Sequence, residues 1–178
     1  MRQVVVDTET TGLNPSSGDR IVEIACVELI DSRISGEEFH YYLNPEMPMP
    51  AAALEVHGLK DDFLADKPCF SEIARQLATF LQDAELIIHN APFDLAFLNA
   101  ELLRCKHLPI ESLCAGVTDT LRIARKHQTT KRNSLDDLCI TFGVATSSRG
   151  HHGALEDARN LADIYVEMRR RWGLAIDA

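Results

Sequence analysis

The order of apolar and polar positions divides the chain into a strand-rich beginning and a helix-rich remainder. Val4, Val5 and Val6 are consecutive β-branched residues, a run typical of a buried strand. Segments 20–30 and 37–43 carry two further strand-like patterns, and turn-forming residues follow the first strand. Three strands joined by short turns predict an antiparallel meander. The prolines within segment 45–50 end it, because proline cannot donate to a sheet.

After these prolines, helical and strand patterns alternate along the chain. The apolar spacing predicts a helix at 71–81, a strand at 85–89, a helix from 90, a strand at 116–119, a helix through the basic residues 122–132, a helix from 135 behind an S-x-x-D capping box, and a last helix at 154–171 closed by Gly173. We therefore expect an α/β domain with a mixed sheet and helices packed against it.

Length and composition favour one domain. The 178 residues, of which 46% are hydrophobic, suffice for one sizeable core, and we assign 1–172 to that domain and 173–178 to a short tail. No apolar run approaches the length of a membrane span, and the strand pattern starts directly after Met1, so neither a membrane segment nor a signal peptide is expected. A cytoplasmic protein is the resulting expectation. The five cysteines form no C-x-x-C pair, which argues against a disulfide framework and a zinc site.

The formal charge of −9 at first argues against a nucleic-acid partner. Positive charge is nevertheless concentrated locally. Five basic residues lie within eleven positions, and a further pair follows: Arg122, Arg125, Lys126, Lys131 and Arg132, then Arg149 with His151. This pattern fits either a local positive patch or an ordinary solvated helix end.

Acidic residues at three places suggest a metal site. Asp7 and Glu9 lie two positions apart on the first strand, so their side chains share one side of it. Two like charges at a buried position need a cation or a proton, although a strand end open to solvent would also accommodate them. Asp94 begins a helix directly after a buried strand, where open α/β sheets place ligands. Asp157 lies in the last helix.

His152 precedes Asp157 by five residues. Five residues correspond to about 500° of helix rotation, so the two side chains would not share a helix face. Gly150 and Gly153 flank the histidines, and we therefore expect His152 on a mobile loop that leads into the helix carrying Asp157.

Four carboxylates and one histidine suit two hard divalent cations, Mg²⁺ or Mn²⁺, because zinc would call for more Cys or His ligands. Paired cations stabilise in-line displacement at phosphorus, and a histidine that titrates near neutral pH can act as the base for the attacking water. The residues therefore favour metal-dependent phosphodiester hydrolysis.

Three segments resemble, in order, the three exonuclease motifs of the DEDD family in its histidine-containing branch: 7–13 (DTETTGL), 89–94 (HNAPFD) and 152–157 (HGALED). Segments 56–59 (VHGL), 67–70 (KPCF) and 131–136 (KRNSLD) further resemble the proofreading exonuclease subunits of bacterial replicative DNA polymerases. The resemblance implies a ribonuclease-H-like fold, with a mixed five-stranded sheet flanked by helices. It also implies 3′→5′ removal of nucleoside 5′-monophosphates.

The same resemblance implies roles for individual residues. It makes Asp7, Glu9, Asp94 and Asp157 the metal ligands and His152 the general base. The family spacing of histidine, four residues and aspartate selects His152 over His151, which leaves His151 as an exposed loop residue or a phosphate contact. The residues implied to hold the terminal nucleotide are Thr10, Gly12, Leu13, His57, Asn90 and Phe93. Core packing is an alternative role for Phe93, and helix capping is one for Asn90.

The implied substrate is a single-stranded or frayed DNA 3′ end, acted on by a monomeric domain. Related polymerase subunits continue into clamp-binding and polymerase-binding segments, whereas residues 169–178 contain no glutamine with spaced hydrophobics. A replicative polymerase and a sliding clamp are therefore open as partners.

Three other functions compete with this interpretation, namely an RNA 3′-exonuclease of the ribonuclease T or oligoribonuclease kind, a free-standing DNA-repair exonuclease, and a metal-loaded binding module without catalysis. The last would need one of the five site residues replaced, and none is. The chain has no G-x-G-x-x-G segment, which sets a nucleotide-cofactor oxidoreductase aside.

Overall fold

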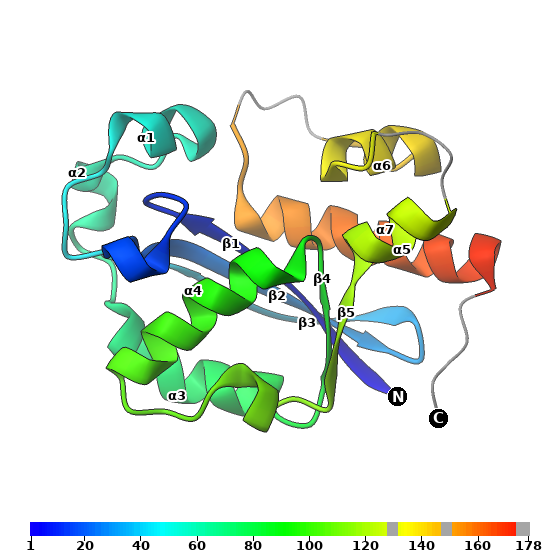
Figure 1. Ribbon diagram of the computed structural model, residues 1–178, viewed down its shortest axis with the longest axis horizontal. Helices are drawn as coiled ribbons and strands as arrows, with labels where there is room; N and C mark the ends of the chain where they lie inside the picture. The colour runs from blue at the N-terminus through cyan, green and yellow to red at the C-terminus, as the bar shows by residue number, and fades with distance from the viewer. Residues whose placement is uncertain (128–131, 147–150, 174–178) are drawn as a thin grey trace.

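The structure is a computed structural model that describes residues 1–127, 132–146 and 151–173. At its centre lies a five-stranded sheet of order β3-β2-β1-β4-β5 (Figure 1). The strands are β1 (Arg2–Thr10), β2 (Ile21–Ile30), β3 (Arg33–Tyr42), β4 (Glu85–Ile88) and β5 (Gly116–Asp119). β1, β2 and β3 pair antiparallel, whereas β4 pairs parallel with both β1 and β5. The predicted meander and the mixed five-stranded sheet are both confirmed.

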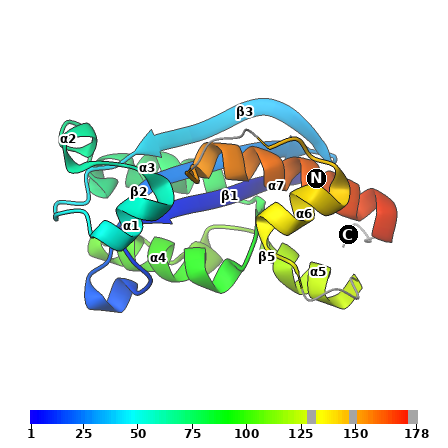
Figure 2. The same ribbon diagram turned by 90° about the horizontal axis from the view of Figure 1, so that it is seen from above.

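Helices cover the two faces of the sheet. They are α1 (Ala51–His57), α2 (Asp61–Leu64), α3 (Phe70–Leu81), α4 (Ala91–Arg104), α5 (Thr120–His127), α6 (Leu135–Phe142) and α7 (Ala154–Trp172). Two short 3₁₀ helices, η1 (Pro15–Ser17) and η2 (Ile110–Ser112), lie in the connections. Figure 2 shows α4 and α7 on opposite sides of β1. No helix in the described part of the chain combines the length and apolar character of a membrane span.

The alternation of side chains along β1 directs its residues to two separate cores. Val4 and Val6 pack with α3 and α4, whereas Val5 packs with α7 on the other face. The same alternation continues into the polar end of the strand. It sends Asp7 and Glu9 toward the face covered by α7, and Thr8 toward the face covered by α4.

The structure differs from the sequence prediction mainly in segment 33–57. β3 begins at Arg33 instead of residue 37, directly after a turn in which Asp31 and Ser32 have positive φ angles of 49° and 63°. Its first residues are exposed, so they carry no apolar signal. Helices α1 and α2 were not predicted, because they are short and follow a proline-rich segment.

The predicted helix ends in the second half of the chain are confirmed. Ser134 and Asp137 form a reciprocal capping box at the start of α6. Gly173 ends α7 in the left-handed conformation, with φ of 59°, and its N–H donates to Arg169. The predicted helix through 122–132 is described only as far as His127, and the rest of that prediction extends into residues outside the described ranges.

Candidate active site

Three carboxylates meet where β1 ends beside the first turn of α7. Asp7, Glu9 and Asp157 each offer one oxygen, and these oxygens all lie within 4.8 Å of one another. β1 supplies the first two residues from alternate positions, as the sequence predicts, and α7 supplies the third. This convergence brings together acids that are about 150 residues apart in the chain.

Asp94 approaches from the first turn of α4 and is almost completely buried. The Thr8 hydroxyl donates to Asp94 Oδ1 over 2.8 Å, so β1 holds this carboxylate through the residue between Asp7 and Glu9. Asp94 is not one of the three acids within 4.8 Å, but its charge still acts on Asp7.

Enclosure and mutual repulsion disfavour the charged forms of these acids. Burial, followed by the charges of Asp94 and Asp157, raises the pKa of Asp7 well above its ordinary value. Burial and the charge of Asp157 raise the pKa of Glu9 to about 8, and burial raises that of Asp94 to about 7. A crowded set of oxygen donors with raised pKa values fits hard divalent cations, whose charge would remove the repulsion.

His152 lies outside α7, on the segment that leads into it, as predicted. Its Nδ1 is 3.1 Å from Asp157 Oδ2, and this hydrogen bond raises the pKa of the imidazole. Its backbone N–H donates to Val56 O of α1 over 3.1 Å. His151 is also exposed, but its ring lies beside Gly58 and is not part of the acidic cluster.

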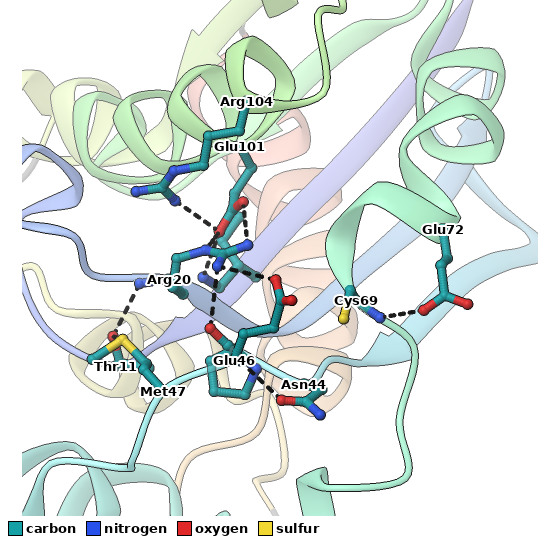
Figure 3. Close-up of polar contacts among 11 residues, drawn as sticks. Thr11, Arg20, Asn44, Glu46, Met47, Cys69, Glu72, Glu101 and Arg104 are labelled. Atoms are coloured by element: carbon teal, nitrogen blue, oxygen red, sulfur yellow. Dashed lines mark hydrogen bonds and ion pairs between the residues drawn. The ribbon is translucent and has the colours of Figure 1, made fainter.

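The loop after β1 is linked to α4 through Arg20, as Figure 3 shows. Thr11 exchanges hydrogen bonds with the backbone of Arg20, whose guanidinium binds the two oxygens of Glu101 over 2.7 and 3.0 Å. Within the loop, Thr10 Oγ1 donates to Gly12 O over 2.6 Å. A Cβ atom on Gly12 would collide with the Asp19 carboxylate, so any other residue there would displace the Asp19 side chain from the loop. Leu13, at the tip of the loop, is 85% exposed.

The other three predicted nucleotide contacts have mixed surroundings. Asn90 occupies the N-cap position of α4, as the helix-capping interpretation expects, with φ of 63°, but its side chain makes no capping hydrogen bond. Phe93 is half-buried, with its ring centroid 5.0 Å from that of Phe97, and it packs against the core while remaining accessible. His57 is buried at the end of α1, and burial lowers its pKa.

The exonuclease family profile (RNase_T) matches residues 4–165. This chain belongs to the exonuclease family. DNA polymerase III subunit epsilon of Rickettsia conorii is 47% identical over 169 residues, which cover 94% of this chain and 74% of that protein. The corresponding subunit of Escherichia coli is 44% identical over 172 residues, with coverage of 94% and 71%. The resemblance to DEDD exonucleases is confirmed.

Solved structures show that this exonuclease shares their fold. Exonuclease X in complex with 5′ overhanging duplex DNA has a TM-score of 0.76 and 24% identity, covering 97% of this chain and 94% of that one. E. coli Exonuclease I in complex with a dT13 oligonucleotide has a TM-score of 0.85 and 16% identity, and the match spans 97% of this chain but 42% of that one. The predicted ribonuclease-H-like fold is confirmed.

Beside His152 the exonuclease has a polar cavity of about 720 Å³, whose walls include His57, His151 and Glu23. Glu23 is not among the site residues that the sequence predicts. This residue is 2% exposed and sits opposite Glu9 in the pairing of β1 with β2. In the sequence, Glu23 stands out as the single charge inside the apolar run 21–27. Only the strand register shows that it lies opposite Glu9.

The basic residues of the exonuclease lie partly in the described structure. Arg122, Arg125 and Lys126 are exposed on α5, and Arg132 is exposed before α6. Lys131 and Arg149 lie outside the described residues. The exposed part of the cluster is compatible with a positive surface, and contact with a nucleic acid stays a prediction.

Proposed function

We propose that this exonuclease hydrolyses the terminal phosphodiester of DNA in the 3′→5′ direction, releases nucleoside 5′-monophosphates, and serves replication proofreading. The observation that carries the proposal is the convergence of Asp7, Glu9 and Asp157 within 4.8 Å, with His152 hydrogen-bonded to Asp157. Similarity to DNA polymerase III epsilon subunits supports the replication role.

In this proposal Asp7, Glu9, Asp94 and Asp157 hold two divalent cations, Mg²⁺ or Mn²⁺. Bound cations supply the positive charge that offsets the charge developing on the phosphodiester and on the attacking and leaving oxygens. The Thr8 hydroxyl orients Asp94, and β1 fixes Asp7 and Glu9 on one face. The donor set supports Mg²⁺ or Mn²⁺, because carboxylate oxygens are preferred by both ions.

His152 acts as the base in the proposed reaction. When the Nδ1–H of its neutral ring donates to Asp157, the lone pair of Nε2 is available to accept a proton from the attacking water. His151 has no comparable partner in the acidic cluster of the described residues. We assign His151 to the wall of the cavity and not to proton transfer.

The terminal nucleotide is proposed to lie over the loop that carries Thr10, Gly12 and Leu13. Its exposed Leu13 offers an apolar surface for a base, and Gly12 keeps the backbone free of a side chain. Three further residues complete the proposed pocket, namely His57, Asn90 and Phe93. An unpaired 3′ end fits this arrangement, because a base must leave its stack to contact these residues.

The proposed partner is the catalytic subunit of a replicative polymerase, in the cytoplasm, since the curated relatives are named as polymerase subunits. The isolated domain is expected to be a monomer. Gel filtration with and without such a catalytic subunit tests the partnership, and co-elution supports it. Separate elution at micromolar concentrations would favour a free-standing repair exonuclease. A sliding clamp, added in a third run, tests clamp binding in the same way.

The activity is tested with a DNA oligonucleotide labelled at its 5′ end and a matched RNA oligonucleotide, each incubated with Mg²⁺. We expect a ladder of DNA products shortened from the 3′ end, with nucleoside 5′-monophosphates released, and faster cleavage of a mispaired than of a paired 3′ terminus. Asp7→Asn serves as the inactive control. Faster cleavage of RNA would instead indicate an RNA 3′-exonuclease, and equal activity of Asp7→Asn would refute the assigned site.

A further inference from the structure

Glu23 is an acid in an unfavourable place. Its side chain is buried, and it lies directly opposite Glu9 on the neighbouring strand. Like charges opposite one another in a sheet are destabilising, and burial adds a further cost. The charge of Glu23 also contributes to the raised pKa of Glu9. An acid at this position therefore needs compensating contacts.

Both carboxylate oxygens of Glu23 have such contacts. Oε2 accepts the backbone N–H of Ala154 over 3.1 Å, and Oε1 lies 2.8 Å from Nε2 of His40 on β3. These contacts distinguish Glu23 from Asp7 and Glu9, which belong to the acidic cluster. Glu23 is also not one of the three acids whose oxygens lie within 4.8 Å of one another.

The contact with Ala154 supplies a helix cap from a distant strand. Ala154 is the first residue of α7, and the first amides of a helix have no partner within the helix. The N-cap residue is Gly153, which has no side chain with which to cap α7. Glu23 fills this role from β2, and its negative charge faces the positive pole of α7.

The residues around this cap belong to the active site. The His152 N–H is held by Val56 O of α1, and two residues later the Ala154 N–H is held by Glu23 of β2. The first turn of α7 then closes when the Asp157 N–H donates to Gly153 O over 3.0 Å. The segment that leads into α7 is thus held by backbone hydrogen bonds at His152 and at Ala154.

We propose that Glu23 is a positioning residue, which anchors the start of α7 to β2 and thereby sets where His152 and Asp157 stand relative to Glu9. Glu9 and Glu23 are paired across β1 and β2. The contact of Glu23 with α7 therefore fixes the start of α7 relative to β1, which carries Asp7 and Glu9. This inference rests on the proposed hydrolysis, in which His152 and Asp157 participate.

The test compares two substitutions that separate the length of the side chain from its charge. Glu23→Gln keeps the length and an acceptor oxygen for Ala154, whereas Glu23→Asp keeps the charge but withdraws the carboxylate by one methylene. Glu28→Asp is the matched control. Glu28 lies on the same strand, is partly buried and binds Arg2 over 2.6 Å, away from the acidic cluster.

Steady-state kinetics with Mg²⁺ and a DNA oligonucleotide provide the first measurement. We expect Glu23→Asp to lower kcat by about 10- to 100-fold, since misplacement of catalytic groups by about 1 Å can cost that much, while KM changes less than about threefold. We expect Glu23→Gln and Glu28→Asp to keep kcat within about threefold of the parent. Loss of kcat in Glu23→Gln equal to that in Glu23→Asp would overturn the proposal.

Hydrogen exchange of the Ala154 amide, followed by NMR without metal, provides a measurement that is independent of activity. Among the described residues this amide donates to Glu23 alone, so exchange should be at least about tenfold faster in Glu23→Asp and unchanged in Glu23→Gln and Glu28→Asp. Unchanged exchange in Glu23→Asp would overturn the proposal.

If Glu23→Asp does not fold, Glu23→Ala takes its place, because it leaves no buried charge. Inactivity of the parent chain would contradict the proposed function, whereas the exchange result tests the anchor separately.

Discussion

His152 Nδ1 lies 3.1 Å from Asp157 Oδ2, so the proposed base and a proposed metal ligand are hydrogen-bonded to each other. This bond raises the pKa of His152. A divalent cation at Asp157 would compete for the same carboxylate and would add positive charge near the imidazole. Both effects favour the neutral ring. We therefore predict that saturating Mg²⁺ lowers the pKa of His152.

NMR titration of the histidine ring signals, with and without Mg²⁺, measures this change. The Asp157→Asn variant is the control, because its side chain no longer carries the charge that holds the imidazolium. Its His152 should titrate at a lower pH than in the metal-free parent, with little further response to Mg²⁺. If Mg²⁺ leaves the pKa of His152 in the parent unchanged, the proposal that Asp157 binds the cation while it contacts His152 would be contradicted.

The raised pKa values of the acids predict how stability depends on pH without metal. The pKa of Glu9 is about 8 in the folded protein and 4.5 in its ordinary surroundings. Between these values the folded state binds more protons than the unfolded state, so the free energy of unfolding falls as pH rises. Asp94, with a pKa of about 7, acts in the same direction. We expect the melting temperature in EDTA to fall by roughly 10–25 °C from pH 5 to pH 8.5.

Glu9→Gln tests the origin of this loss. A neutral side chain removes one charge from the cluster, so the variant should melt at a higher temperature than the parent at pH 8 in EDTA, while its nuclease activity falls by about 100-fold or more. Mg²⁺ should raise the melting temperature of the parent more than that of the variant. If Glu9→Gln melts below the parent at pH 8 without metal, repulsion does not dominate this site.

Much of the fold followed from local patterns because the signals were strong. The valines of β1, the capping box at Ser134 and the glycine after α7 each have one favoured structural role. Helix α1 and the start of β3 were missed for the opposite reason. α1 is short and begins after Pro50, and the first half of β3 is exposed, so neither segment shows a clear apolar period.

The acidic residues of the site could be predicted because each one interrupts an apolar pattern or starts a helix. Glu23 interrupts a strand in the same way, yet its importance depends on the register that sets it opposite Glu9 and on the distant amide of Ala154. Register and long-range caps arise from packing of the whole chain, and no local pattern of residues encodes them.

Thr8 offers a direct test of how Asp94 is held. Thr8→Val keeps the shape of the buried side chain but removes the hydroxyl that donates to Asp94 Oδ1. We predict roughly tenfold lower activity and a higher Mg²⁺ requirement, because a support of a proposed ligand is lost. Thr79→Val is the control, since the Thr79 hydroxyl donates to Arg75 O on the exposed side of α3. Equal Mg²⁺ dependence of Thr8→Val and the parent would exclude this role.

The pair of Arg20 and Glu101, drawn in Figure 3, is predicted to support both the fold and the loop that carries Thr10, Gly12 and Leu13. Glu101 is 1% exposed, so Arg20→Ala leaves a buried carboxylate with two weaker contacts, from Arg104 at 3.3 Å and from the backbone N–H of Ile21 at 3.4 Å. Breaking such a pair costs about 3–5 kcal/mol, which corresponds to a melting temperature roughly 10 °C lower.

The double variant Arg20→Met with Glu101→Leu separates these two effects. It removes both charges, so thermal melting should recover most of the lost stability. The loop after β1, which contains Thr11, would still lack its polar link to α4. We therefore expect KM for DNA to stay several-fold above that of the parent, while kcat changes less. Full recovery of KM in the double variant would mean that Arg20 supports the fold alone and does not orient the loop.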